Sequence, residues 1–165
     1  MKKDITIGLF GTCGTSKWRD PFIKKYNELG INYFNPQVEN WNGGLAQHEA
    51  VHLSKDQIIL LPVTGETYGS GSLTEIGFSI LQTLKPEDTR YFIVLTEENL
   101  SKDLNDEIAR NESIRSRRLV KEHLNKLNLK NVFIVKSLDE MLDTSLKVYE
   151  LLCEYENLKN NKTES

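Results

Sequence analysis

Short apolar runs alternate with helical patterns along the whole chain, and this alternation limits the possible folds more than any other feature. Five runs have the length and the β-branched or aromatic content of strands: residues 5–10, 31–34, 57–63, 90–95 and 131–135. Strands separated by helices are joined by right-handed crossovers and lie parallel. The sequence therefore predicts an α/β fold, with a doubly wound, five-stranded, mostly parallel sheet of the flavodoxin or Rossmann type and helices on both faces.

Helical patterns fill the intervals between these runs, over residues 20–30, 45–54, 73–84, 103–127 and 138–158. Asp20 is expected to cap the first helix with Pro21 at its first position, and Gly30 is expected to end it. We expect one domain over residues 1–159, followed by a polar, frayed tail over residues 160–165.

Composition and charge exclude several classes of function. Charged residues make up 27% of the chain and hydrophobic residues 38%, as in an ordinary globular protein. The net charge of -3 argues against a nucleic-acid partner, because phosphate binding favours a basic surface. No apolar run reaches the roughly 18 residues that a membrane span needs. The first residues lack a small-residue cleavage site, so we expect no signal peptide.

The cysteine content points to the compartment. Cys13 and Cys153 form neither a metal-binding pattern nor a disulfide framework. We therefore expect a reducing compartment and a cytoplasmic protein. We also expect that it needs no metal and no cofactor.

Ligands of doubly wound sheets bind beyond the carboxyl ends of the strands, where the strand order reverses. The loop over residues 11–19, GTCGTSKWR, follows the first strand there and is rich in small and hydroxyl residues. It matches neither a dinucleotide fingerprint nor a Walker loop. Its backbone N–H groups favour a polar or anionic ligand, although a mobile loop without a ligand has the same composition. Cys13 has no histidine close in sequence to activate it, so a small buried or half-buried thiol is expected.

The loop after the third strand carries the strongest candidate for chemistry. Residues 64–75, TGETYGSGSLTE, contain three glycines that allow the backbone to approach a ligand closely. They end at Glu75, where the dipole of the next helix favours an ionised carboxylate. Ser72 and Glu75 also have the spacing of a capping box, which is the commoner explanation of this pattern. The stripe expected to face the sheet leaves Glu75 on the opposite side of the helix: Leu73, Ile76, Gly77, Ile80, Leu81 and Leu84.

A second carboxylate lies inside the apolar face of the preceding helix. Leu45, Ala46, Ala50 and Leu53 form this face, and Glu49 falls in its middle. An unpaired buried charge is costly, so Glu49 is either paired or directed at a site. A salt-bridged glutamate at the end of an imperfect stripe fits the pattern as well as a functional residue does.

Three segments carry a resemblance to a known family: FGTCGTSKWRD, FNPQVENW and SKDQIILLPVTGETYGSGSLTEIGFSI. Over roughly residues 5–95 the chain resembles the nucleoside 2-deoxyribosyltransferase-like family. The resemblance implies that Glu75, followed by x-Gly, attacks the anomeric carbon of a 2-deoxyribonucleoside or its monophosphate and expels the base. The sugar then passes to another base or, in the hydrolase relatives, to water.

The resemblance also implies roles for other residues. Glu49 matches an acidic residue that contacts the nucleobase, and it could give a proton to the leaving base. A loop aspartate six residues before the nucleophile is replaced here by Gly69, for which Glu66 or Tyr68 could substitute. A homo-oligomer is expected. The residues expected to contact the nucleoside or nucleotide are Phe10, Gly11, Thr12, Cys13, Gly14, Trp18, Asn35, Trp41, Glu66, Tyr68, Gly69 and Ser72.

Some of these residues have two explanations. Trp18 and Trp41 could each stack on a base or pack in the protein. Lys17 and Arg19 could hold a 5′-phosphate, or the hydroxyl groups of the same loop could hold a 5′-hydroxyl. The arginines of the helix over residues 103–127 are expected on a solvated, charge-balanced face: Arg110, Arg115, Arg117 and Arg118.

Two other classes of protein compete with the enzyme. The absence of the loop aspartate favours a binding or sensing module that keeps the nucleoside pocket without catalysis. A receiver domain fits less well, because the third strand ends in Pro62, Val63 and Thr64 with no phosphorylatable aspartate. An FMN-binding flavodoxin also fits less well, because no hydroxyl-rich phosphate loop of the flavodoxin kind closely follows the first strand.

Overall fold

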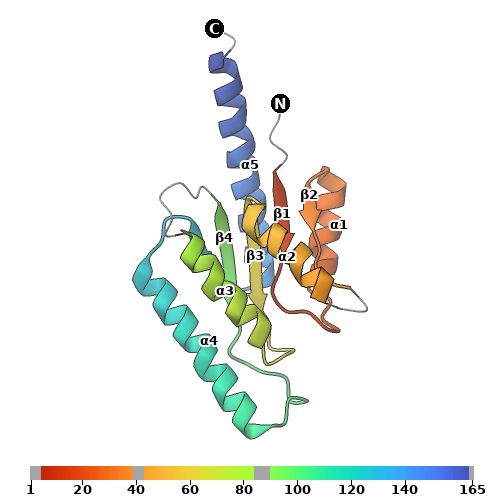
Figure 1. Ribbon diagram of the computed structural model, residues 1–165, viewed down its shortest axis with the longest axis vertical. Coiled ribbons are helices and arrows are strands. Elements are labelled where there is room, and N and C mark those ends of the chain that lie inside the picture. The colour runs from red at the N-terminus through yellow and green to blue at the C-terminus, as the bar shows by residue number, and fades with distance from the viewer. Residues whose placement is uncertain (1–4, 39–42, 84–89, 164–165) are drawn as a thin grey trace.

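The computed structural model describes residues 5–38, 43–83 and 90–163, and these residues form one parallel sheet with helices around it (Figure 1). The strands are β1 (Thr6–Leu9), β2 (Asn32–Phe34), β3 (Ile58–Val63), β4 (Tyr91–Thr96) and β5 (Val132–Ile134). They lie in the order β2-β1-β3-β4-β5, and every pairing is parallel. The predicted α/β fold is confirmed, and the strand order is flavodoxin-like.

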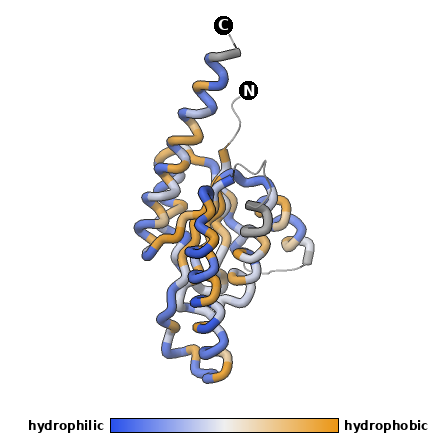
Figure 2. The backbone as a smooth tube through the Cα atoms, turned by 90° about the vertical axis from the view of Figure 1, so that its left-hand side faces the viewer, coloured by the Kyte–Doolittle hydropathy of each residue, from blue (hydrophilic) through white to orange (hydrophobic). Residues whose placement is uncertain are grey.

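The helices cover the two faces of the sheet. One face packs against α1 (Arg19–Leu29) and α5 (Leu138–Thr163), and the other against α2 (Gly43–Lys55), α3 (Ser70–Thr83) and α4 (Glu107–Leu127). Figure 2 shows the apolar residues gathered in the strands and alternating with hydrophilic residues along the helices. Both faces of the sheet are therefore shielded from water, which explains the near-continuous apolar strands of the sequence.

The central strand β3 contributes to both cores. All six of its residues are buried. Ile58 and Leu60 pack with α1 and α5, whereas Ile59, Leu61 and Val63 pack with α2, α3 and α4. This division follows from the alternation of side chains along a strand.

The strand order reverses between β1 and β3. From β1 the chain runs to β2 on one side, and it then crosses to β3 on the other side. The loops that leave the carboxyl ends of β1 and β3 therefore turn to opposite faces of the sheet, toward α1 and α3. In folds of this kind ligands bind in a crevice at this switch point, between the loops that follow β1 and β3.

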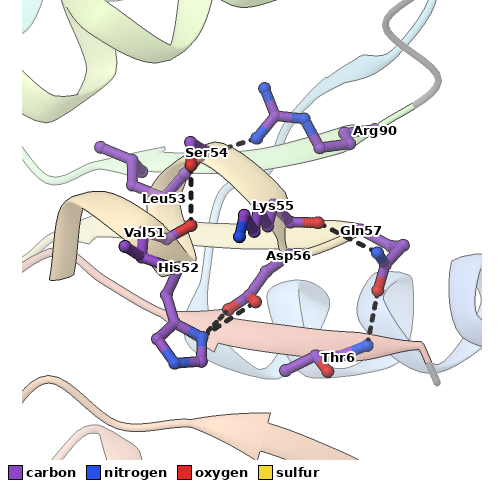
Figure 3. A network of polar contacts seen from close by, with 9 residues as sticks. All are labelled: Thr6, Val51, His52, Leu53, Ser54, Lys55, Asp56, Gln57 and Arg90. Atoms are coloured by element: carbon purple, nitrogen blue, oxygen red, sulfur yellow. Dashed lines mark hydrogen bonds and ion pairs between the residues drawn. The ribbon is translucent and has the colours of Figure 1, made fainter. Parts of the chain in front are cut away.

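A polar network at the opposite edge of the sheet holds α2 in place (Figure 3). His52 Nδ1 lies 3.0 Å from Asp56 Oδ1, and the His52 ring stacks on Phe34 at 3.6 Å between ring centroids. Arg90 Nη1 donates to the carbonyl of Leu53 at 2.7 Å, and the Thr6 amide donates to Gln57 Oε1 at 2.9 Å. The end of α2 is thereby joined to β1, β2 and β4.

Several predicted helix ends are wrong. The N-cap of α1 is Trp18, without a side-chain hydrogen bond, so Asp20 is not the cap; the Asp20 amide instead donates to the Lys17 carbonyl. The start of α4 is later than predicted because the Asp106 side chain caps it, accepting from the Ala109 amide at 2.8 Å. The helix α5 continues to residue 163, so most of the predicted frayed tail is helical. The end of α1 at Gly30, with φ of 65°, is confirmed.

Substitution of a central core residue tests this packing. Leu60 in β3 is fully buried, so Leu60→Ala is expected to lower the free energy of unfolding by about 2–5 kcal/mol. Leu158→Ala is the matched control, because Leu158 on α5 is 63% exposed and its loss should change stability by less than about 0.5 kcal/mol. Urea unfolding of both variants measures the difference, and similar losses would contradict the buried position of Leu60.

Candidate active site

Glu75 lies at the crevice between β1 and β3. The helix α3 begins at Ser70, and its first helical bond runs from the Leu73 amide to the Gly69 carbonyl at 2.9 Å. Ser72 is therefore inside the first turn, and Glu75 is in the second turn. The capping-box interpretation is wrong, because Ser72 is not the N-cap. The carboxylate of Glu75 instead reaches the loop after β1, where its Oε2 accepts from the Gly11 amide at 3.4 Å.

The face of α3 that packs on the sheet differs in part from the predicted stripe. Ile76 is buried and Leu73 packs against the core, as predicted, but Ser72 and Ser79 are buried as well and Gly77 is exposed. Small serine side chains allow the helix to approach the sheet closely, and the helix is rotated accordingly. Glu75 lies one turn from Ser72 and from Ser79, so it borders the buried face rather than opposing it. The side chains of Ile80, Leu81 and Leu84 lie outside the described residues.

Burial controls the ionisation of Glu75. Desolvation is the main cause that raises the pKa of this carboxyl to about 7, and the negative charge of Glu49 acts in the same direction. The Gly11 amide and the positive charge of Arg19 act in the opposite direction. The charge of Glu49 also acts on the pKa of Cys13. The helices α2 and α3 therefore bring the two predicted catalytic carboxylates to the same crevice.

The loops after β1 and β3 are joined through Gly11 and Thr12. Gly11 has a φ of 87°, and a Cβ atom there would lie 2.4 Å from the Pro62 carbonyl oxygen, so only glycine fits. The Thr12 amide donates to the Pro62 carbonyl at 2.8 Å. The Thr12 hydroxyl accepts from the Thr64 amide at 2.9 Å. Thr12 was predicted to contact the ligand, but its buried hydroxyl is engaged between the two strands.

Arg19 is buried beneath the loop after β1. Its Nε donates to the Leu9 carbonyl at 2.9 Å, and its Nη1 donates to the Thr12 carbonyl at 2.6 Å. Its Nη2 lies 3.4 Å from Cys13 Sγ. The guanidinium thus faces the protein, which differs from the hypothesis that Arg19 holds a phosphate. Lys17 is exposed.

Cys13 is exposed, although it was expected to be buried or half-buried. Its thiol donates to the Gly11 carbonyl at 3.4 Å. Desolvation raises the pKa of this thiol and exceeds the opposing effect of Arg19, so the protonated form is favoured. The neighbouring Gly14 has a φ of 75° and accepts from Gln37 Nε2 through its carbonyl at 2.8 Å.

The aromatic candidates lie mainly in the core. Trp18 is 4% exposed, packs edge-on against Phe22, and donates from its Nε1 to the Thr12 carbonyl at 2.8 Å. Its ring is therefore a packing residue and offers no free face to a base. Phe10 is also buried, where it packs against α2 and α3. Asn35 forms a turn in which its side chain accepts from the Gln37 amide at 3.0 Å. Trp41 lies outside the described residues.

The loop after β3 directs its polar side chains to different neighbours. Glu66 Oε2 accepts hydrogen bonds from Ser16 Oγ and, at 2.8 Å, from Thr64 Oγ1, so Glu66 joins the two loops of the crevice. The Tyr68 hydroxyl accepts from the Asp106 amide at 3.3 Å and so points toward the start of α4. Gly69 has a φ of 74°, and a Cβ atom there would lie 2.5 Å from Val63 Cγ1.

Sequence reasoning missed the role of Arg117. This side chain was predicted on a solvated face of α4, but it is fully buried. Its Nη1 donates to the carbonyls of Val63 at 2.6 Å and Glu97 at 2.8 Å, and its Nη2 donates to the Thr67 carbonyl at 2.7 Å. Arg117 therefore holds the loop that leads into α3. Its place among four arginines of one charged helix gave no sign of this role.

The described residues contain no group of three or more His, Cys, Asp or Glu side chains arranged to hold a metal ion. None of the helices in the described part of the chain has both the length and the apolar character needed to cross a membrane.

Comparison with known proteins adds no family assignment, because no family model matches the sequence and no curated protein matches it at a significant level.

The raised pKa of Glu75 predicts a pH-dependent effect on stability. An unfolded glutamate titrates near pH 4.3, so between there and about pH 7 the folded protein retains a proton that the unfolded chain loses. The native state thus loses stability as the pH rises through this window. Glu75→Gln avoids this loss and is expected to be about 2 kcal/mol more stable than wild type at pH 8, but equally stable near pH 4.5.

Urea unfolding at the two pH values measures this difference. The exposed Glu122→Gln is the matched control, since it removes one negative charge from α4 without changing the crevice. An equal Glu75→Gln effect at pH 4.5 and pH 8 would contradict the raised pKa of the Glu75 carboxyl.

Proposed function

We propose that this protein cleaves the N-glycosidic bond of a 2-deoxyribonucleoside, or of its monophosphate, with Glu75 as the nucleophile. The deoxyribosyl group then passes to another base or to water. The observation that carries the proposal is the half-buried Glu75 carboxylate, held by the Gly11 amide at the switch between β1 and β3 with the charge of Glu49 nearby. The motifs that resemble the nucleoside 2-deoxyribosyltransferase-like family surround this site.

The contacts of Glu75 suit nucleophilic attack. The Gly11 amide engages Oε2, which leaves Oε1 to attack the anomeric carbon. As the new C–O bond forms, the C–N bond breaks and its electron pair goes to the base, through an oxocarbenium-like transition state. Glu49 in its protonated form is the proposed acid: it gives its proton to the departing base and is left as a carboxylate. Attack by an acceptor base or water on the same carbon then releases Glu75, with net retention of configuration.

The proposal includes a homo-oligomer, and the cytoplasm as the compartment that the cysteine content indicates. The outer side of α3, the helix that carries Glu75, supports a second copy as a neighbour, because Phe78 there is 56% exposed.

A second candidate is a module that binds nucleosides without catalysis. Gly69 favours it, because the positive φ and the close approach of Val63 and Arg117 leave no room for the side chain of a loop aspartate. Such a module would bind a deoxynucleoside in calorimetry and release no base.

An activity assay with Glu75 variants tests the proposal. Deoxynucleosides and their monophosphates are incubated with and without an acceptor base, and base release is followed by chromatography. Glu75→Ala and Glu75→Gln should reduce turnover by about a thousandfold or more, because they remove the nucleophile. Glu49→Gln should reduce turnover by about a hundredfold. The reduction should be smallest for substrates whose base is a good leaving group. Wild-type kcat/KM should rise with pH through about 7, as Glu75 loses its proton.

Glu122→Gln again serves as the control and should retain wild-type turnover. Near-normal turnover by a folded Glu75→Ala protein would exclude Glu75 as the nucleophile. Binding without any base release would favour the second candidate.

A covalent intermediate is the sharpest expected consequence of the mechanism. Acid quenching during turnover of a slow substrate should leave one deoxyribosyl group on the protein, on the peptide that contains Glu75. Peptide mass spectrometry measures this addition, with Glu75→Gln as the control that should carry none. If turnover is confirmed but no adduct accumulates at any quench time, direct displacement by water is the better mechanism.

A further inference from the structure

We propose that Arg19 is a positioning residue for Glu75, which it orients through the peptide group between Phe10 and Gly11. This inference rests on the proposed function in so far as it gives Glu75 a catalytic task. The geometry itself involves only the contacts of three neighbouring groups at the end of β1.

The peptide group between Phe10 and Gly11 is hydrogen-bonded at both ends. Arg19 Nη2 donates to the Phe10 carbonyl at 3.3 Å, and the Gly11 amide donates to Glu75 Oε2 at 3.4 Å. The C=O and N–H of a trans peptide are coplanar and point in opposite directions. The bond from Arg19 therefore turns the Gly11 N–H toward Glu75. It also polarises the peptide, which strengthens the bond that the carboxylate accepts.

Arg19 is rigid enough to fix this direction. It is 1% exposed, its guanidinium lies 4.5 Å from the centroid of the Trp18 ring, and it donates to the carbonyls of four consecutive residues. Those residues are Leu9, Phe10, Gly11 and Thr12. A planar fork of donors is needed to reach such a set of acceptors, and a lysine ammonium does not provide it.

The charge of Arg19 adds to the effect of its hydrogen bonds. The hydrogen-bond acceptors around its guanidinium are neutral: the four carbonyls, the Gln37 side chain and the Cys13 thiol. The ionisable side chains that interact with it electrostatically are Cys13 on its own loop, Glu75 on α3 and Glu49 on α2. The positive charge of Arg19 favours the ionised form of Glu75, against desolvation and against Glu49. The hydrogen-bond relay and the charge thus favour the same state, an oriented carboxylate.

Titration of the Glu75 carboxyl tests the inference without requiring turnover. The protein is labelled with ¹³C at the glutamate side-chain carboxyls, and the Glu75 resonance is assigned by its loss in Glu75→Gln. The Gly11 amide proton is followed in the same titrations. Wild type is compared with Arg19→Met, Arg19→Lys and Arg110→Met. Arg110→Met is the control, because the half-buried Arg110 also donates to backbone carbonyls, those of Ser101 and Leu104, but does not hold either loop of the crevice.

In Arg19→Met the titration midpoint of Glu75 should rise by about half a pH unit or more. The chemical shift of the Gly11 amide proton should no longer change as Glu75 titrates. Arg19→Lys keeps the charge and loses the fork, so the midpoint should rise less while the Gly11 response still weakens. Arg110→Met should leave both observations at wild-type values. A folded Arg19→Met with the wild-type midpoint and Gly11 response overturns the inference.

If Arg19→Met does not fold, the titration of Arg19→Lys tests the inference instead. A wild-type Glu75 midpoint and a wild-type Gly11 response in Arg19→Lys would then overturn it. The failure of the proposed function has a different signature. In that case no substrate of the panel is cleaved, whatever the titrations give. If turnover depends on Glu75 but the Glu75 midpoint is unchanged in the Arg19 variants, only the positioning role of Arg19 is excluded.

Discussion

The close approach of the carboxyl ends of β1 and β3 is the constraint on which the candidate site depends. Thr12 makes this approach by bonding both to the Pro62 carbonyl and to the Thr64 amide, which continues the pairing of the two strands beyond the sheet. Gly11 permits it because no side chain fits beside Pro62. As a consequence, an amide of the loop after β1 faces a carboxylate from α3, although α1 and α3 lie on opposite faces of the sheet.

Two buried arginines donate hydrogen bonds to the backbone carbonyls of neighbouring loops. Irregular backbone at a sheet edge exposes carbonyls that no strand satisfies, and unsatisfied buried carbonyls are costly. Arg19 donates hydrogen bonds to carbonyls at the end of β1 and after it, and Arg117 to carbonyls at the ends of β3 and β4. Each cation is surrounded by dipoles rather than paired with a buried carboxylate, so its charge is not neutralised locally. In the crevice, the result is a fixed backbone and a positive field from Arg19 near Glu75.

The fold could be predicted from the sequence because strands covered on both faces are apolar throughout, as in β3. The local errors have a common cause, since tertiary packing decided what local pattern could not. Gly69 in a left-handed conformation allows α3 to begin at Ser70, and the sheet selects Ser72 and Ser79 for close contact. A helical wheel weighted by hydrophobicity places such serines on the solvent-exposed side of the helix. The contacts of the two arginines were hidden for a similar reason, because a buried arginine bound to carbonyls has no sequence pattern that distinguishes it from a solvated one.

The ionisation of Glu75 depends on effects that oppose one another. A nucleophile must be ionised when it attacks, but the desolvation that makes a carboxylate reactive also favours its protonated form. At Glu75, burial and the charge of Glu49 act toward protonation, while the Gly11 amide and Arg19 act toward ionisation, and the pKa settles at about 7. The position of α2 therefore matters to the chemistry, because it sets how strongly Glu49 acts on Glu75. The contact of His52 with Asp56, and its stacking on Phe34, anchor α2 one turn beyond Glu49 at the far edge of the sheet. The electrostatic balance at one edge of the sheet thus depends on a polar network at the other.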